Sequence, residues 1–416
     1  MIKPTALPLP APAPSALKPL QQRHLHDLRG ATRLATDATL ALAALVEAMH
    51  ARIASLPGLR GGEQTRGITG LVYKSVRGVT RLVGGSLDGV LAALTPMLTP
   101  MLTGQPDGTG DGLSTERDTV LAVLNGVLGD HLAATGNSLA TPMTLRHHGQ
   151  ALVLQPAALR AALPTATGRV LVLLHGLCMN DHQWLRDGHD HGAALAQAAG
   201  YTPLYLHYNR GLTFQSNGAA FALQMQALLA AWPQPLQRVV LLGHSMGGLV
   251  VRSALHQGAA DHQAWVQQVD DAVFLGAPHM GAPLERAGHW VDLILGATPY
   301  AGPLARLGAM RSAGITDLRH GQLLAGPPNA LPVHVPLPTQ PRCYAIAGTT
   351  GSREQDLKDR LLGDGLVPLG SALGRHADAA RCLNFDPARQ LQLLQTNHLA
   401  LLSSPAVAAA LLRWLA

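Results

Sequence analysis

The stretch Arg238-Val239-Val240-Leu241-Leu242-Gly243-His244-Ser245-Met246-Gly247-Gly248-Leu249-Val250 decides how this chain folds. It begins with a short apolar, partly β-branched run, which is typical of a buried strand. Gly-x-Ser-x-Gly follows, and then a segment through His256 that is compatible with a helix. A strand, a tight turn and a helix around one serine predict a nucleophile elbow, with Ser245 at the helix N-terminus. A glycine-rich turn with an ordinary serine is the alternative interpretation.

The composition is that of a folded protein with a large core. Hydrophobic residues make up 47% of the 416 positions, and charged residues only 13%. The formal net charge of +6 is scattered, without a lysine-rich tract, so we expect no nucleic acid partner. We find neither a signal-peptide pattern nor an uncharged apolar run of about 18 residues. A cytoplasmic protein is therefore expected, with peripheral membrane association left open.

The three cysteines, Cys178, Cys343 and Cys382, are far apart and show no C-x-x-C spacing. This spacing indicates a reducing compartment rather than a disulfide framework. Two of them, Cys343 and Cys382, hold the second position of two expected strands, at residues 342–347 and 381–385. Their thiols would lie close if those strands are neighbours, and two buried, unpaired thiols are the alternative.

Residues 1–140 carry little visible chemistry. We expect residues 1–20, which are rich in Pro and Ala, to be disordered, and residues 21–140 to form a helical N-terminal extension. Its helices are expected near residues 21–56, 68–94 and 114–134. The second has an apolar stripe at helical spacing, with Lys74, Arg77 and Arg81 on the other face. Such a stripe usually packs against a partner helix, and docking on a lipid or polymer-granule surface is the alternative.

From Thr144 onward, strand-like runs alternate with helical segments, which predicts an α/β domain over residues 144–416. A hairpin at 144–154 precedes expected strands at 169–174, 203–208, 239–242, 272–275, 343–347 and 382–385. Residues 280–340 interrupt the alternation with Gly, Pro and clustered apolar side chains, Trp290 among them. Because long insertions at the carboxyl edge of a sheet are usually functional, we expect a cap or lid here. A purely structural excursion is the alternative.

A nucleophilic serine needs a base, and the base needs an acid that orients it. In an elbow-bearing sheet the acid follows the next-to-last strand and the histidine follows the last one. Asp364, between two glycines, and His398, the last histidine of the chain, fit these positions. Asp386 is the second candidate for the acid. The backbone N–H groups of Leu177 and Met246 are the expected oxyanion donors.

Five motifs occur in order between residues 144 and 416. They are His175-Gly176-Leu177, Gly243–Gly248, Gly276–Gly281, Gly363–Pro368 and Asn397-His398-Leu399. Together they resemble the α/β-hydrolase lipases, among them bacterial triacylglycerol lipases, and the esterases related to GPI inositol-deacylase. The resemblance implies an α/β-hydrolase fold and carboxylic-ester hydrolysis by a triad of Ser245, Asp364 and His398. It also implies that the turn at 209–211 and the Pro278-His279 motif line the cleft, with His279 in a structural role.

The expected substrate is a small-molecule or lipid ester. The residues expected to bind it are His175, Gly176, His244, Asn209 and Trp290. Cofactors and metal ions are not expected, since the 20 histidines show no H-E-x-x-H or zinc-finger spacing. An acyltransferase or thioesterase that uses the same serine, and a lipid- or granule-binding scaffold, are the alternative functions.

Overall fold

The structure is a computed structural model that describes residues 26–37, 39–40, 74, 77–78, 80–81, 110–282, 312–326, 332–352 and 363–416. Contacts divide the chain into two compact units. The first comprises Met1–Gly110 and Thr135–Leu139, and the second comprises Asp111–Ala134 and Ala140–Ala416.

In the first unit, the described residues up to position 81 are helical. The turn at 135–139 is tied to the first helical segment, because the Asn137 side-chain amide donates to the Gly30 carbonyl at 2.9 Å. The expected tail at 1–20 and most of the expected second helix lie outside the described residues. A surface role for that helix stays a prediction. None of the described helices combines the length and apolar character needed to cross a bilayer.

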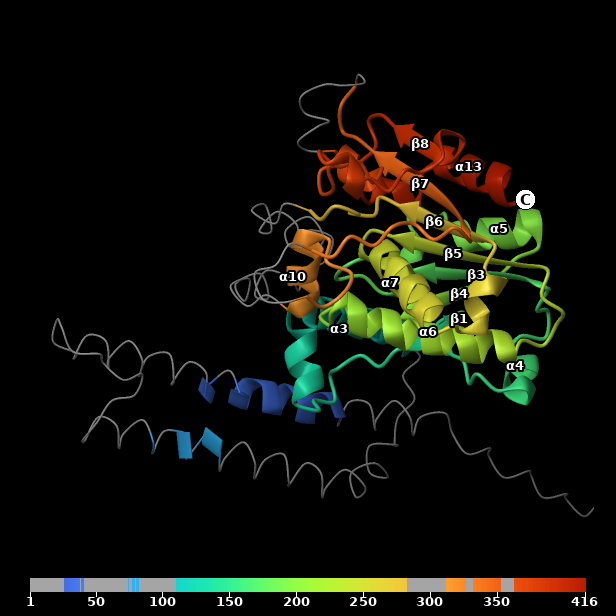
Figure 1. Ribbon diagram of the computed structural model, residues 1–416. Coiled ribbons are helices and arrows are strands. Elements are labelled where there is room, and N and C mark those ends of the chain that lie inside the picture. Colours follow the sequence, from blue (N-terminus) through green and yellow to red (C-terminus); the bar gives the residue numbers. More distant parts are fainter. Residues whose placement is uncertain are drawn as a thin grey trace, which may run out of the picture. The chain divides into compact units, whose positions relative to one another are not determined.

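In the second unit, the described residues form an eight-stranded sheet in the order β2-β1-β4-β3-β5-β6-β7-β8 (Figure 1). The strands are β1 (Thr144–His147), β2 (Gln150–Ala151), β3 (Arg169–Leu174), β4 (Thr202–His207), β5 (Arg238–His244), β6 (Asp271–Leu275), β7 (Arg342–Gly348) and β8 (Gln390–Leu393). β1 pairs antiparallel with both β2 and β4. All pairs from β4 through β8 are parallel, so these strands end at one common edge.

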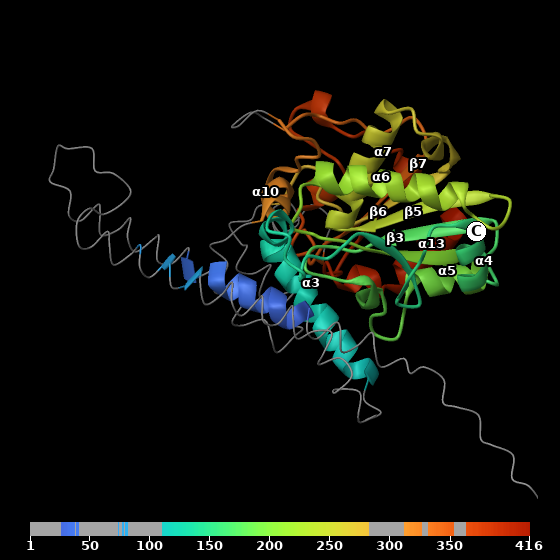
Figure 2. The same ribbon diagram turned by 90° about the horizontal axis from the view of Figure 1, so that it is seen from below.

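Helices cover both faces of this sheet. The α-helices of the second unit are α3 (Gly110–Ala134), α4 (Pro156–Ala162), α5 (His191–Ala199), α6 (Phe214–Ala230), α7 (Met246–Ala260), α10 (Ala313–His320), α12 (Leu369–Ala372) and α13 (Pro405–Leu415). Short 3-10 helices are η1 (Asp181–Trp184), η2 (Ala264–Gln268), η4 (Ala379–Arg381), η5 (Pro387–Arg389) and η6 (Ala400–Leu402). Figure 2 shows α6 and α7 on one side of the sheet and α5 and α13 on the other.

The apolar run of β5 explains this layering. Side chains alternate between the two faces of a strand, and a strand covered on both faces must be apolar throughout. Val239 and Leu241 belong to the core shared with α6 and α7. Val240 and Leu242 belong to the core shared with α5 and α13. One continuous hydrophobic run therefore supplies two separate cores.

The turn after β5 is the elbow that the sequence predicts. Ser245 adopts φ 54° and ψ −125°, a sparsely populated conformation for a residue with a side chain. The turn is so tight that a Cβ on Gly243 would lie 2.6 Å from the Gly248 Cα. A mostly parallel sheet in this order, covered on both faces and bearing this elbow, is the α/β-hydrolase fold. The predicted fold class is confirmed.

The predicted strand at 382–385 is wrong, because the strand that pairs with β7 is β8. Leu383 and Phe385 alternate like strand residues because their side chains are buried in the core. The backbone between them does not join the sheet, and Leu383 N–H instead donates to the Gly374 carbonyl at 2.9 Å. Cys343 and Cys382 are therefore not neighbours in adjacent strands, and all three cysteines are free.

The helix α3 belongs by its contacts to the second unit, whereas the sequence pattern groups it with the N-terminal extension. Its carbonyl oxygens accept hydrogen bonds from three side chains of the α/β domain. Arg210 Nη2 donates to Ala122 at 2.9 Å, Asn209 Nδ2 to Gly129 at 2.8 Å, and Ser312 Oγ to Gly126 at 2.7 Å. Ser312 is the N-cap of α10, so α3 also anchors the described part of the expected lid.

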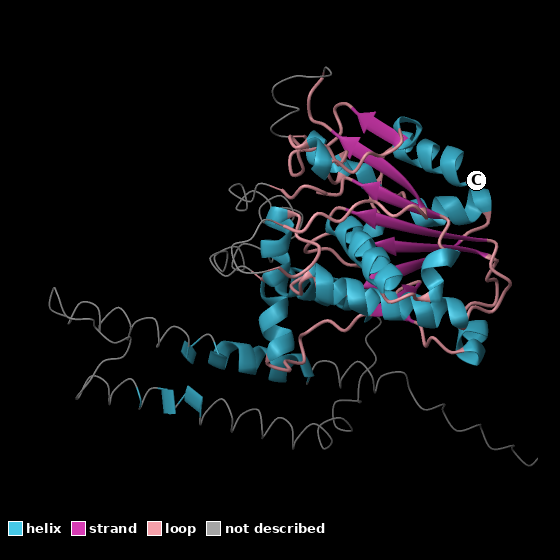
Figure 3. Ribbon diagram, in the orientation of Figure 1, coloured by secondary structure: helices cyan, strands magenta, loops and turns pink. Residues whose placement is uncertain are grey.

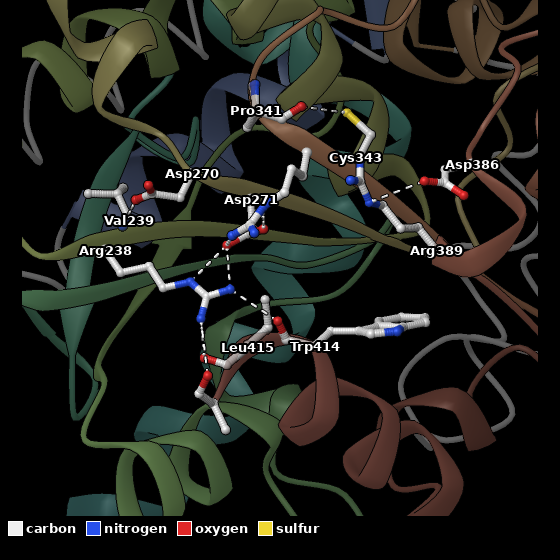
Figure 4. A network of polar contacts seen from close by, with 12 residues as sticks. Arg238, Val239, Asp270, Asp271, Pro341, Cys343, Asp386, Arg389, Trp414 and Leu415 are labelled. Carbon is white, nitrogen blue, oxygen red and sulfur yellow. Dashed lines mark hydrogen bonds and ion pairs between the residues drawn. The ribbon is translucent and has the colours of Figure 1, made fainter.

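The last turn of α13 is bound at the start of β5, the end of the strand that lies away from the elbow. Arg238 lies at the start of β5, where its Nε donates to Asp271 Oδ2 at 2.9 Å. Its Nη1 donates to the Leu415 carbonyl at 2.8 Å and its Nη2 to the Trp414 carbonyl at 3.0 Å (Figure 4). Cations at a helix C-terminus satisfy carbonyls that lack an intrahelical partner. This arginine therefore ties the last turn of α13 to the central strand.

Candidate active site

The residues predicted to be catalytic, Ser245, Asp364 and His398, follow the strands β5, β7 and β8 in the chain. The arrowheads in Figure 3 mark the carboxyl edge at which these strands end. Ser245 directly follows β5 and is only 1% exposed. Its backbone N–H donates to the Leu275 carbonyl at the end of β6, at 2.8 Å. Its hydroxyl oxygen has no hydrogen-bond partner among the described residues. The elbow thus fixes the backbone of the serine without using its hydroxyl.

His398 and Asp364 form a buried pair. His398 Nδ1 lies 2.7 Å from Asp364 Oδ2, and the side chains are 2% and 1% exposed. The other carboxylate oxygen accepts the backbone N–H groups of Leu366 at 3.0 Å and Val367 at 2.8 Å. The backbone N–H of His398 donates to the Asp364 carbonyl at 3.0 Å. These contacts determine which ring nitrogen of His398 carries the proton. Because a carboxylate only accepts hydrogen bonds, Nδ1 is the protonated nitrogen and Nε2 is the one with a free electron pair.

Leu275 and Gly276 connect the serine to this pair. Leu275 accepts the Ser245 N–H, as described above, and Gly276 is the next residue. A Cβ built on Gly276 would lie 3.3 Å from Asp364 Oδ2 and 3.3 Å from His398 Cε1. The end of β6 is therefore packed between the elbow and the acid–base pair. The absence of a side chain at Gly276 lets the pair approach that edge.

His244 makes a second link between the elbow and the histidine. Its Nε2 lies 3.2 Å from the His398 carbonyl oxygen, and the two ring centroids are 4.7 Å apart. Burial, with a smaller contribution from His398, holds the pKa of His244 well below its usual value. The imidazole is consequently neutral, with its proton on Nε2.

The expected oxyanion donors flank the same point. Met246 is the first residue of α7, so its N–H has no carbonyl within the helix to bind. The end of β3 packs directly on this turn. A Cβ on Gly176 would lie 3.0 Å from the Ser245 Cβ, and one on Gly247 would collide with the Leu174 carbonyl. Leu177 follows Gly176 and is buried. The two predicted amides thus come from the two segments that meet at Ser245.

Four of the other predicted substrate-binding residues are described. Gly176 and His244 lie beside the Ser245 turn, as described above, and a Cβ built on Gly247 in that turn would lie 2.8 Å from the His175 carbonyl oxygen. The side chains of His175 and Asn209 are buried. The His175 ring stacks on Tyr208 at 4.8 Å, and Asn209 binds the α3 carbonyl named above. Trp290 lies outside the described residues.

The second candidate acid, Asp386, is not the partner of His398. It caps the exposed helix η5, where its side chain accepts the Ala388 N–H at 2.9 Å, and it lies 3.7 Å from Arg389. The sequence pattern placed it at the end of the last strand, but it precedes β8. The sequence did not predict that His244 binds the His398 carbonyl or that Gly276 packs against the His398–Asp364 pair. Both residues nevertheless belong to two of the five motifs.

Among the described residues, no group of three or more His, Cys, Asp or Glu side chains is arranged to hold a metal ion.

Residues 140–318 match the model of a domain family of unknown function, DUF7379. This match spans fewer than half of the 416 residues. Curated proteins gave no significant match to the sequence.

Several solved structures are similar to this chain at low sequence identity. The mature lipase BlEst2 of Bacillus licheniformis is 20% identical over 59% of this chain and 91% of that one, with a TM-score of 0.39. The RedJ thioesterase of the prodiginine pathway from Streptomyces coelicolor is 15% identical over 61% of this chain and 92% of that one, with a TM-score of 0.37. The Pyrococcus furiosus esterase Pf2001 is 15% identical over 60% of this chain and 82% of that one, with a TM-score of 0.35.

Proposed function

We propose that this protein is a serine hydrolase that cleaves carboxylic esters with Ser245 as nucleophile, His398 as base and Asp364 as orienting acid. The observation that carries the proposal is the buried His398–Asp364 pair, 2.7 Å apart, packed against Gly276. The neighbouring residue Leu275 binds the backbone of Ser245, whose positive φ is the strained geometry of a nucleophile elbow.

The proposed reaction has two halves. Ser245 Oγ attacks the ester carbonyl carbon while His398 Nε2 takes the hydroxyl proton, and the Leu177 and Met246 amides bind the oxyanion. The carbon–oxygen bond to the alcohol breaks, and the alcohol leaves with the proton from His398. Water then attacks the acyl-enzyme, His398 takes a proton from it, and this proton returns to Ser245 as the carboxylic acid departs.

The proposed substrate is a small-molecule or lipid ester. A thioesterase or an acyltransferase would use the same three side chains and differ in the leaving group or the acceptor. The relation to GPI inositol-deacylase stays a prediction from the five motifs. Product analysis with added alcohols and with thioesters separates these activities, because each gives a different acyl product or a different released group.

A series of p-nitrophenyl esters from acetate to palmitate, assayed on the full chain and on Ser245→Ala, tests the proposal. We expect Ser245→Ala to lower turnover by about 10⁴- to 10⁶-fold, as for comparable triads. Ser403→Ala is the matched control, because Ser403 Oγ is hydrogen-bonded to the exposed Asp187. Esterase activity that is the same in Ser245→Ala and in the unmodified protein would overturn the assignment.

A further inference from the structure

A cavity of about 240 Å³ lies between α7, α10 and the segments at 332–335 and 376–383. None of the three proposed catalytic residues lines it. Among the described residues, its ionisable lining side chains are three arginines, Arg252, Arg319 and Arg381, and four histidines, and none is acidic. Side chains that carry positive charge, without a negative one beside them, favour an anion.

The key residue of this cavity is Arg252 on α7, which is 4% exposed. Its Nη1 lies 3.5 Å from His279 Nδ1, and its Nη2 donates to the Val335 carbonyl. Its Nε has no hydrogen-bond partner, and no carboxylate pairs with this guanidinium among the described residues. Burial lowers the pKa of Arg252 to about 10, which leaves it charged at neutral pH. A buried charge without a counter-ion is costly, so an anion in the cavity would be stabilising.

His279 presents a second unsatisfied donor. Because an arginine only donates, His279 Nδ1 must be the acceptor of the Arg252 Nη1 contact. Burial and the nearby Arg252 hold the pKa of His279 well below its usual value, so the ring is neutral and carries its proton on Nε2. This Nε2 is buried and has no hydrogen-bond partner in the described structure.

Arg381, at the end of η4, is a second arginine of the lining. Its Nη2 donates to the Pro332 carbonyl at 3.1 Å, while its buried Nε has no partner. Asp378 belongs to the same loop, but its carboxylate accepts the Ala380 N–H and pairs with neither arginine among the described residues. Burial is the largest cause that lowers the pKa of His334 at the cavity; the charges of Arg252 and Arg381 lower it further, and Asp378 opposes them. Both arginines are therefore close enough to His334 to affect its titration.

We propose that this cavity binds a phosphate group. Arg252 and Arg381 supply two permanent positive charges at its lining, and no acidic side chain of the described lining offsets them. Backbone carbonyls anchor both guanidinium groups, so little side-chain entropy remains to be lost on binding. A phosphate has several acceptor oxygens and up to two negative charges, which suit two arginines. The phosphate is either free inorganic phosphate or part of a larger organic phosphate monoester.

Calorimetric titration of the full chain with inorganic phosphate and with glycerol 3-phosphate tests the proposal and separates the two sources. We expect saturable binding that Arg381→Ala weakens by about 10- to 100-fold, the loss typical of one hydrogen bond between charged groups. Arg160→Ala, which removes an exposed arginine of α4, should bind like the unmodified chain. Tighter binding of glycerol 3-phosphate identifies a larger phosphate-bearing ligand, and tighter binding of inorganic phosphate identifies the free ion.

Two results overturn the proposal. One is the absence of saturable binding of either compound to the unmodified protein, and the other is equal affinity in Arg381→Ala. Because Arg381 is half-buried, thermal unfolding of each variant is measured without ligand first. If Arg381→Ala does not fold, Arg381→Gln replaces it, since glutamine keeps a polar side chain and removes the charge. A bound phosphate should also raise the Tm of the unmodified chain and not that of the arginine variant.

Discussion

The Nε2 atom of His244 lies 3.2 Å from the backbone carbonyl oxygen of His398. A carbonyl only accepts, so His244 donates this hydrogen bond and keeps Nδ1 without a proton. His244 directly precedes Ser245, and His398 is the proposed base. One side chain therefore couples the position of the elbow to the position of the loop that carries the base.

Removing this hydrogen bond should misplace His398 without removing any reacting group. We expect His244→Leu to lower kcat by about 10-fold or more, because a displacement of the base by 1 Å is costly in rate. His244→Gln should recover much of the loss, since its amide keeps a donor near the Nε2 position. Steady-state kinetics across a pH series provide the measurement. Equal kcat values in Leu and Gln variants would show that His244 only fills space.

Replacing the proposed orienting acid should affect the tautomer of the base. In Asp364→Asn we expect the proton of His398 to shift toward Nε2 and kcat to fall by about 10³- to 10⁴-fold, as in comparable triads. Asp386→Asn is the control, because Asp386 is the other acid that the sequence offers and it contacts Arg389 instead. A larger loss in Asp386→Asn than in Asp364→Asn would reverse the assignment.

Arg238 should contribute to stability rather than to activity. In Arg238→Ala the buried Asp271 loses one of its two arginine partners and α13 loses the cation at its last turn. We expect the free energy of unfolding to fall by about 2 to 4 kcal/mol. Urea denaturation measures it. Arg413→Ala, which removes an exposed arginine of α13, is the control and should change the denaturation midpoint little. A similar drop in both variants would argue against a role for the Arg238 contacts in stability.

Stability should fall as the solution becomes acidic, because several buried histidines stay neutral in the folded protein. Burial holds the pKa values of His175, His244 and His279 well below the usual value, and that of His191 at about 4. The unfolded chain takes up these protons below about pH 6.5, and the folded chain does not. Each histidine should therefore cost roughly 1 kcal/mol of stability per pH unit below that point.

Two groups act in the opposite direction. Burial raises the pKa of Asp317 to about 6, and a hydrogen bond to Asp118 raises the pKa of His182, so both gain protons more readily in the folded state. Because four histidines outweigh these two groups, we expect a net loss of stability. Urea denaturation at pH 7.5, 6.5 and 5.5 checks it (about one unit apart, across the range in which free histidine titrates). Constant or rising stability over this range would contradict the burial argument.

The sequence determined the elements whose signals are local. The apolar run of β5 with its Gly-x-Ser-x-Gly turn identifies a buried strand and an elbow by itself, because period and turn chemistry reside in adjacent residues. Asp364 and His398 were identified from strand order, since parallel strands bring their carboxyl ends to one edge. The strand assigned to 382–385 failed because burial of Leu383 and Phe385 gives the same alternation as a paired strand.

Only the tertiary structure decided which distant residues meet. The contact between His244 and His398, the packing of Gly276 against the His398–Asp364 pair and the attachment of α3 to the loop after β4 join residues far apart in the chain. The same holds for the cavity of Arg252, His279 and Arg381, whose members look like isolated basic residues in the sequence. Hydrogen bonding and burial of charge depend on distance in space, and no periodicity along the chain encodes that distance.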